Sequence, residues 1–160
     1  MTMSFYRLIW LLPIAFALHV TEEFATGYPA YATEVTGYPM ALPMFLGSNT
    51  LCIVIMALLT RWAAKTHKPN AVFWTLLWAA GNLFWNFVYH AAAEVAHQRY
   101  SPGIITGTLI YLPLSLLVWR AALAERPITG AALANAIALG GVFMGIVAAV
   151  GIYHVGGVGA

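Results

Sequence analysis

Three ionisable residues stand at the end of an apolar stretch near the beginning of the chain: His19, Glu22 and Glu23, in the run ALHVTEEFATG. A charged side chain at the centre of a bilayer costs about 2.5–3.5 kcal/mol even on the lenient insertion scale. Two adjacent glutamates in such a stretch therefore need partners or water. On a helix, His19 comes three residues before Glu22 and four before Glu23, so all three side chains can face inward from adjacent turns.

A second apolar stretch carries the same kinds of side chain. Asn82, Asn86, His90 and Glu94 recur every four residues and form one polar stripe on one face of a helix. Two helices that each offer imidazole and carboxylate groups resemble the inward-facing ligand sets of carboxylate-bridged metal bundles. A divalent metal would also neutralise the buried carboxylates. The predicted metal ligands are His19, Glu22, Glu23, His90 and Glu94.

The predicted metal is zinc, which suits histidine and carboxylate ligands, or iron or manganese if the carboxylates dominate. The alternative is a metal-free, hydrogen-bonded cluster with one carboxylate protonated, because two like charges close together disfavour ionisation of both. Glu94 has a second interpretation as the ion-pair partner of Arg99. His97 lies beside Arg99 and is expected to be a solvated histidine at the membrane interface, and no role is assigned to His154.

The composition defines the class of protein. Of 160 residues, 62% are hydrophobic and 8% are charged, and the mean hydropathy is +0.81. Soluble domains have about 25% charged residues, so this is an integral membrane protein. The formal charge of +2 forms no run suited to a phosphate backbone, so no nucleic acid partner is expected. Cys52 is the only cysteine, which excludes an intrachain disulfide.

A transmembrane helix needs about 20 predominantly apolar residues. The sequence predicts an all-α bundle of five spans that forms a single membrane domain over residues 1–160. Ser101 and Pro102 are expected to begin the fourth span as its N-cap and first helical residue. A repeated TGYP, at 26–29 and again at 36–39, is expected to form a plug at the membrane interface, or else a substrate lid. The predicted spans are roughly 4–26, 41–60, 71–97, 103–122 and 130–154.

The basic residues predict the orientation. All but Arg99 lie on one side of the predicted spans, and the positive-inside rule places that side in the cytoplasm. We therefore expect a cytoplasmic N-terminus and an external C-terminus in a bacterial inner (plasma) membrane. At about 1.5 Å per residue, Glu22 and Glu23 lie at nearly the same depth as Asn86 and His90, in the outer leaflet. The residues on the cytoplasmic side are Arg7, Arg61, Lys65, Lys68, Arg120 and Arg126.

The order of these motifs resembles the HXXEE family of small prokaryotic membrane proteins. The resemblance rests on HVTEE at 19–23, an asparagine in the next span, Asn86 four residues before His90, and YSPG at 100–103. It covers nearly the whole chain and implies no particular reaction. Glu94 and His97 do not match the pattern. The positions that the resemblance implies are His19, Glu22, Glu23, Asn49, Asn86, His90, Tyr100, Pro102 and Gly103.

Three functions remain compatible with these residues. The first is an enzyme that uses a metal, or only acid–base groups as in an isomerase or hydratase, on a lipid or isoprenoid-like substrate. Glu22 would be its base, with Tyr100 and Asn86 as further catalytic groups. The second is a transporter or proton relay, and the third is a haem-binding electron-transfer bundle with His19 and His90 as axial ligands. The expected partners are membrane lipids and a lipophilic small molecule. A homo-oligomer is also compatible with the sequence.

Overall fold

Five helical stretches of the described chain are long and apolar enough to cross a membrane. The computed structural model describes residues 3–37 and 39–153. The predicted all-α bundle of five spans is confirmed, and the predicted bounds differ from the observed ones by a few residues. His154, the last residue of the predicted fifth span, lies outside the described residues. The stretches are Phe5–Ala25, Leu42–Thr66, Pro69–His97, Ile104–Glu125 and Gly130–Ala149.

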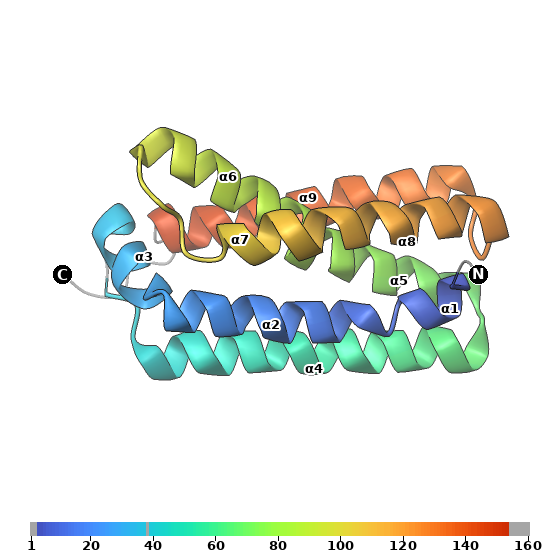
Figure 1. Cartoon of the computed structure of the whole chain (residues 1–160). Coiled ribbons are helices and arrows are strands. Elements are labelled where there is room, and N and C mark those ends of the chain that lie inside the picture. Colours follow the sequence, from blue (N-terminus) through green and yellow to red (C-terminus); the bar gives the residue numbers. More distant parts are fainter. Residues whose placement is uncertain (1–2, 38, 154–160) are drawn as a thin grey trace.

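The spans lie side by side as an elongated bundle, with the N-terminus near one end and a short helix, α3, at the other (Figure 1). Two spans contain a π-helical segment between α-helices: 80–85 between α5 and α6, and 107–111 between α7 and α8. Segments of this kind are frequent at functional sites. The α-helices are α1 (Phe5–Leu8), α2 (Leu11–Ala25), α3 (Tyr28–Thr36), α4 (Leu42–Thr66), α5 (Pro69–Ala79), α6 (Asn86–His97), α7 (Ile104–Thr106), α8 (Leu112–Glu125) and α9 (Gly130–Tyr153).

The two TGYP segments frame α3. Gly27 begins this helix and Gly37 ends it, both with left-handed backbone, at φ +83° and +76°. Glycine adopts this conformation without the steric penalty of a Cβ. The repeat therefore produces a short helix between two sharp turns, where the sequence predicted an interfacial plug or a lid.

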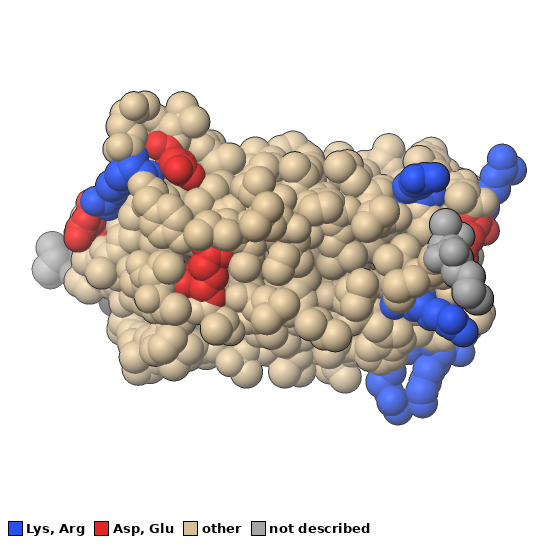
Figure 2. Space-filling view, in the orientation of Figure 1, with Lys and Arg blue, Asp and Glu red and all other residues tan. Residues whose placement is uncertain are grey.

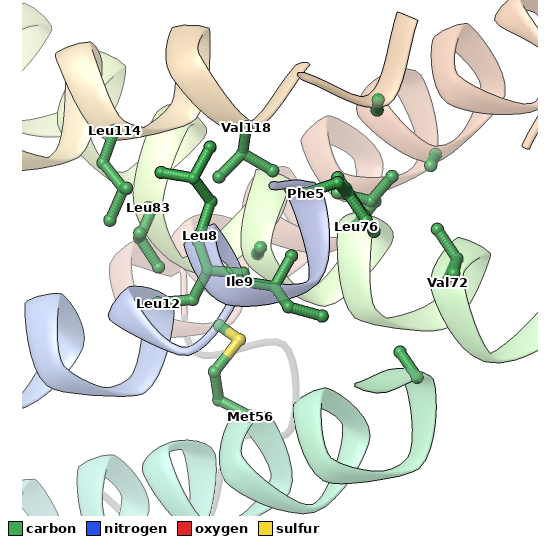
Figure 3. Close-up of a cluster of buried hydrophobic side chains, with 14 of the residues drawn as sticks. Phe5, Leu8, Ile9, Leu12, Met56, Val72, Leu76, Leu83, Leu114 and Val118 are labelled. Carbon is green, nitrogen blue, oxygen red and sulfur yellow. The ribbon is translucent and has the colours of Figure 1, made fainter. Parts of the chain in front are cut away.

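A hydrophobic core fills the half of the bundle that contains the N-terminus. Phe5 and Ile9 of the first span, Met56 of α4 and Leu76 of α5 are fully buried there, and Val118 of α8 is 1% exposed. Figure 3 shows these side chains pointing toward one another from the different helices. Because lipid is as apolar as these side chains, their close packing is what stabilises this half.

Small residues let α9 approach the third span. A Cβ on Gly140 would lie 2.7 Å from the backbone nitrogen of Gly81, and one on Gly141 would lie 2.8 Å from the Trp85 ring. A Cβ on Gly145 would meet nothing within 4 Å. Glycine at 140 and 141 is therefore required by the close approach of backbones and rings, whereas no neighbour requires it at 145.

Charge is distributed unevenly along the bundle. Figure 2 shows Lys and Arg side chains gathered at the end where the N-terminus lies, and a broad band without them along most of the length. At the other end, Arg99 pairs with Glu34 of α3 at 2.7 Å. This arrangement agrees with the distribution of basic residues from which the orientation was predicted, and the orientation itself stays a prediction.

Candidate metal centre

Three of the predicted ligands meet inside the bundle. Nε2 of His90, on α6, lies 3.2 Å from Oε1 of Glu23, on α2, and Nε2 of His19 lies 3.5 Å from the same oxygen. One ligand atom from each residue lies within 4.8 Å of the others. The exposed fractions of the three residues are 1% or less for the histidines and 5% for Glu23. The shared depth of the two motifs, estimated from helical rise, is thus correct.

Each imidazole is held through its other ring nitrogen. Nδ1 of His19 lies 2.8 Å from the Thr106 hydroxyl, and Nδ1 of His90 lies 3.0 Å from the Ser101 hydroxyl. The His19 ring also stacks on Tyr111, with centroids 4.4 Å apart. Contacts of this kind fix the ring orientation of metal-binding histidines and leave the second nitrogen free to coordinate.

The second nitrogen of each ring lies at ion-pair distance from a carboxylate oxygen but makes no hydrogen bond of good geometry. Nε2 of both His19 and His90 is buried and has Oε1 of Glu23 beside it. Buried polar groups without partners are rare and call for an ion or a water molecule. Two atoms that each lie 2.0–2.1 Å from a tetrahedral metal are about 3.3 Å apart, close to the 3.2 and 3.5 Å separations from Glu23. Two of the three separations thus match those of metal ligands, and the whole group is compact enough to hold a divalent cation.

Glu22 has a different environment from Glu23. Its carboxylate accepts hydrogen bonds from the Tyr100 hydroxyl and from the backbone N–H groups of Gly103, Ile105 and Thr106, at 2.7–3.2 Å. The first N–H groups of a helix lack partners within the helix. Glu22 of α2 therefore caps the fourth span, and the structure does not bring it into the group of His19, Glu23 and His90.

The predicted N-cap of the fourth span is wrong. Helix α7 begins at Ile104, and the Ser101 side chain is buried against His90 instead of capping the helix. The general preference for serine as N-cap and proline as first residue does not determine where this helix begins. Its first N–H groups are bonded instead by Glu22, which belongs to another span. Ser101 instead acts through His90, a role that sequence reasoning missed.

Tyr100, predicted as a catalytic group, donates to Glu22. Partial burial raises the pKa of its phenol, and the hydrogen-bonded Glu22 carboxylate raises that pKa further. The phenol therefore keeps its proton and remains a donor. Tyr100 therefore helps to hold the Glu22 carboxylate where it caps the fourth span. The residue is 41% exposed.

Gly103 closes one side of the metal centre. Its backbone is left-handed, at φ +103°. A Cβ at this position would lie 2.7 Å from Cε1 of His19 and 2.9 Å from Cε1 of His90. Glycine is therefore required both by the conformation and by the space. The turn before α7 packs its backbone directly onto the two imidazoles.

Two predicted residues lie outside the group. Glu94 is half-buried and is not one of the three clustered side chains. Its alternative interpretation as the partner of Arg99 receives no support either, because Arg99 bonds to Glu34 and lies over the Tyr31 ring at 4.7 Å. His97 is exposed, as expected for an interfacial histidine.

Asn86 lies beside the centre, in the wall of a cavity of about 190 Å³ that His19 and Glu23 also line. Its side-chain oxygen is buried and has no partner. Sequence reasoning placed Asn86 in the site but did not identify Tyr111, which is fully buried in a π-helical segment. A single tyrosine within an apolar span was the signal available for it.

The fold and the site define the class: an integral membrane bundle of five helices with a buried group of two histidines and a glutamate in the described chain. A family model described as "protein of unknown function with HXXEE motif" matches residues 10–118. The match spans more than half of the chain, so the chain belongs to this family. No curated protein and no solved structure matches it.

Proposed function

We propose that this protein is a metal-dependent membrane enzyme, with a divalent cation held by His19, Glu23 and His90. The observation that carries the proposal is the convergence of two buried Nε2 atoms on one carboxylate oxygen, with ligand atoms of all three residues within 4.8 Å of one another. Two histidines and one glutamate form the ligand set of several catalytic zinc sites, which keep a further position open. The adjoining cavity supplies space for a substrate at such a position.

A divalent metal, when bound, polarises an oxygen or lowers the pKa of water, which suits a hydrolase. The protein residues have separate tasks in this proposal. Ser101 and Thr106 orient the two imidazoles through Nδ1. Glu23 balances the charge of the cation, and the turn at Gly103 excludes water from one side.

Glu22 acts as a positioning residue in this proposal and not as the base that the sequence predicted. Four donors already occupy its carboxylate. Through its cap it holds the turn that carries Ser101 and Gly103 against the histidines. Asn86 keeps its predicted catalytic role, because it lines the same cavity as His19 and Glu23 and its side-chain oxygen has no hydrogen bond.

The proposed location is the outer leaflet of a bacterial inner membrane, with the N-terminus in the cytoplasm. The gathering of basic side chains at the end near the N-terminus supports this orientation (Figure 2). The site then lies in the outer half of the bilayer, and a substrate would reach it from the lipid. This agrees with a lipid or isoprenoid-like substrate.

The geometry favours an enzyme over the two alternatives. Within the described residues, the buried acidic and imidazole side chains are those of the metal group, and the opposite half buries hydroxyls such as Thr60 and Thr75. A proton relay would need further titratable steps across the membrane. Axial haem ligands lie on opposite faces of a porphyrin, whereas His19 and His90 both approach the same Glu23 oxygen.

The decisive test is elemental analysis of the protein purified in detergent after growth with zinc, iron and manganese. We expect a stoichiometric metal in the wild type and its loss in His19→Ala and His90→Ala. The matched control is His97→Ala, which removes an exposed histidine of the same span as His90 and should keep the metal. A wild-type protein without metal, or a His90→Ala variant that retains it, would contradict the proposal.

A further inference from the structure

The cavity beside the metal centre has two kinds of wall. Its polar lining includes His19 and Glu23 with three asparagines, Asn49, Asn82 and Asn86. The remainder is mostly apolar and rich in methionine, whose flexible side chain adapts to ligands of varied shape. These apolar residues include Met40, Met44, Phe45, Phe143, Met144 and Val147. A ligand that matches both walls has a polar head and a hydrocarbon part.

The cavity reaches the surface that faces lipid. Met44 of α4 and Val147 of α9 both line it, and they are 67% and 46% exposed. The space of about 190 Å³ equals that of about six water molecules, at about 30 Å³ each. This volume accommodates a head group and the first part of a chain. The rest of a longer chain would extend between α4 and α9 into the bilayer.

The asparagines offer acceptors. The amide nitrogen of Asn49 donates to the carbonyl of Phe45, and that of Asn82 donates to the carbonyl of Trp78. A backbone carbonyl can only accept, so these contacts assign the amide orientation and leave the side-chain oxygens as acceptors. Asn86 adds a buried oxygen without any partner. These three oxygens favour a head group that donates hydrogen bonds.

Charge narrows the head group further. No lysine or arginine is among the residues that line the cavity, so the positive charge open to a phosphate or carboxylate head would be the divalent cation of the proposed function, on which this step rests. A fully ionised head of this kind has no hydrogen to donate, so it cannot satisfy the asparagine oxygens. An ammonium head can donate, but the cation would repel it. A hydroxyl is neutral, donates one hydrogen bond and accepts others, so it can satisfy an asparagine oxygen and also approach the metal centre.

We infer that this cavity binds a neutral amphiphile with a hydroxyl head, such as a long-chain alcohol, which enters sideways between α4 and α9. The inference gives the substrate class of the proposed enzyme. Cys52 offers a built-in reporter, because it is the only cysteine of the chain, lines the cavity and is half-buried. A ligand in the cavity should shield its thiol.

The experiment measures the rate at which methyl methanethiosulfonate modifies Cys52 in the metal-loaded, full-length protein in nanodiscs, read by mass spectrometry. The probes are dodecanol, dodecyl phosphate and dodecylamine. We expect dodecanol at ten times its Kd to slow the reaction about tenfold, because only the unoccupied fraction reacts. The other two should slow it little. Equal protection by dodecyl phosphate, or none by dodecanol, would overturn the inference.

Variants connect the protection to the asparagines. Asn86→Leu, with Asn49→Leu as a second variant on another helix, should abolish protection by dodecanol. Asn135→Leu is the matched control, since Asn135 is exposed on α9 and does not line the cavity. Full protection in both cavity variants would contradict the inference. If Cys52 of the wild type does not react, retention of dodecanol in native mass spectra replaces the thiol readout, with the same outcomes.

His90→Ala separates this inference from the proposed function. His90 does not line the cavity, so the variant should lose the metal and still bind dodecanol. If dodecylamine protects Cys52 of this variant as well as dodecanol does, the result supports repulsion of the ammonium head by the cation in the wild type. A wild type that holds metal but gives dodecanol no preference would refute the alcohol site and leave the metal enzyme standing. A wild type that binds dodecanol without any metal would refute the metal enzyme and leave the alcohol site standing.

Discussion

The two halves of the bundle are built differently. The half near the N-terminus is a hydrocarbon core, with Phe5, Met56 and Leu76 fully buried in regular α-helices. The other half buries His19, Glu23 and His90, and its fourth span begins at a left-handed glycine. The three clustered side chains themselves lie on α-helices, α2 and α6. The irregular backbone is in the turn at Gly103, which packs onto the two imidazoles where a side chain would not fit. Simple packing needs only apolar faces, whereas this half also needs a close approach of the backbone to the buried polar group.

A smaller comparison lies within the HXXEE motif itself. Glu22 and Glu23 are neighbours in the chain, but successive residues on a helix point about 100° apart. Glu23 therefore faces the histidines, whereas Glu22 faces the start of the fourth span. The motif combines one residue that joins the buried histidine group and one that fixes the turn packed against that group.

The largest expected effect follows from Glu23→Gln. Removal of the ligand charge should lower metal affinity by more than about 100-fold, since even outer contacts to ligands are worth 10–100-fold. Equilibrium dialysis with zinc measures the change. Glu22→Gln is the matched control and should bind zinc much more tightly than Glu23→Gln. The comparison of the glutamates fails if the two variants lose the metal equally.

The next effect tests the hydrocarbon half. Leu76→Ala should destabilise the fold by about 2–5 kcal/mol, because a fully buried side chain leaves a cavity and loses its packing contacts. Unfolding in mixed micelles with increasing dodecyl sulfate measures the loss. The folded variant should bind zinc like the wild type. Loss of zinc affinity without loss of stability would mean that the two halves are not independent.

A moderate effect is expected for Glu22→Gln. The amide accepts hydrogen bonds more weakly than a carboxylate, and bonds to a charged group contribute about 1.5–3 kcal/mol each. Partial solvent exposure reduces this, so we expect a net loss of about 1–2 kcal/mol, from the same principle. Hydrogen exchange should show faster opening at the N–H groups of Ile105 and Thr106. Unchanged exchange at both would show that Glu22 is not the cap.

The smallest effect is expected for Arg99→Ala. Arg99 and Glu34 are 42% and 63% exposed in their side chains, and pairs of this kind contribute at most about 1 kcal/mol. The contact with the Tyr31 ring adds little at an exposed position. Thermal unfolding at low and high salt measures the change. A loss comparable to that of Leu76→Ala would show that the contact with α3 holds this end of the bundle together.

Some of the site could be predicted and some could not. The types and spacing of His19, Glu23 and His90 predicted that they meet, because intramembrane charge needs compensation wherever it occurs, and the structure brings them together. The sequence did not predict that Ser101 contacts His90 or that Glu22 caps the fourth span. Local preferences place serine at a helix start, but they carry no information about a carboxylate that arrives from another span.

The sequence by itself determined the membrane class and the five spans, because hydrophobic length and the cost of buried charge are properties of each segment alone. It also determined the common depth of the two motifs, because helical rise is constant. Only the tertiary structure decided which glutamate faces the histidines, which hydroxyls hold them, and where a cavity remains. Those outcomes depend on how whole helices rotate and pack against one another, and residues as distant in the chain as Glu22 and Thr106 meet only after that packing is complete.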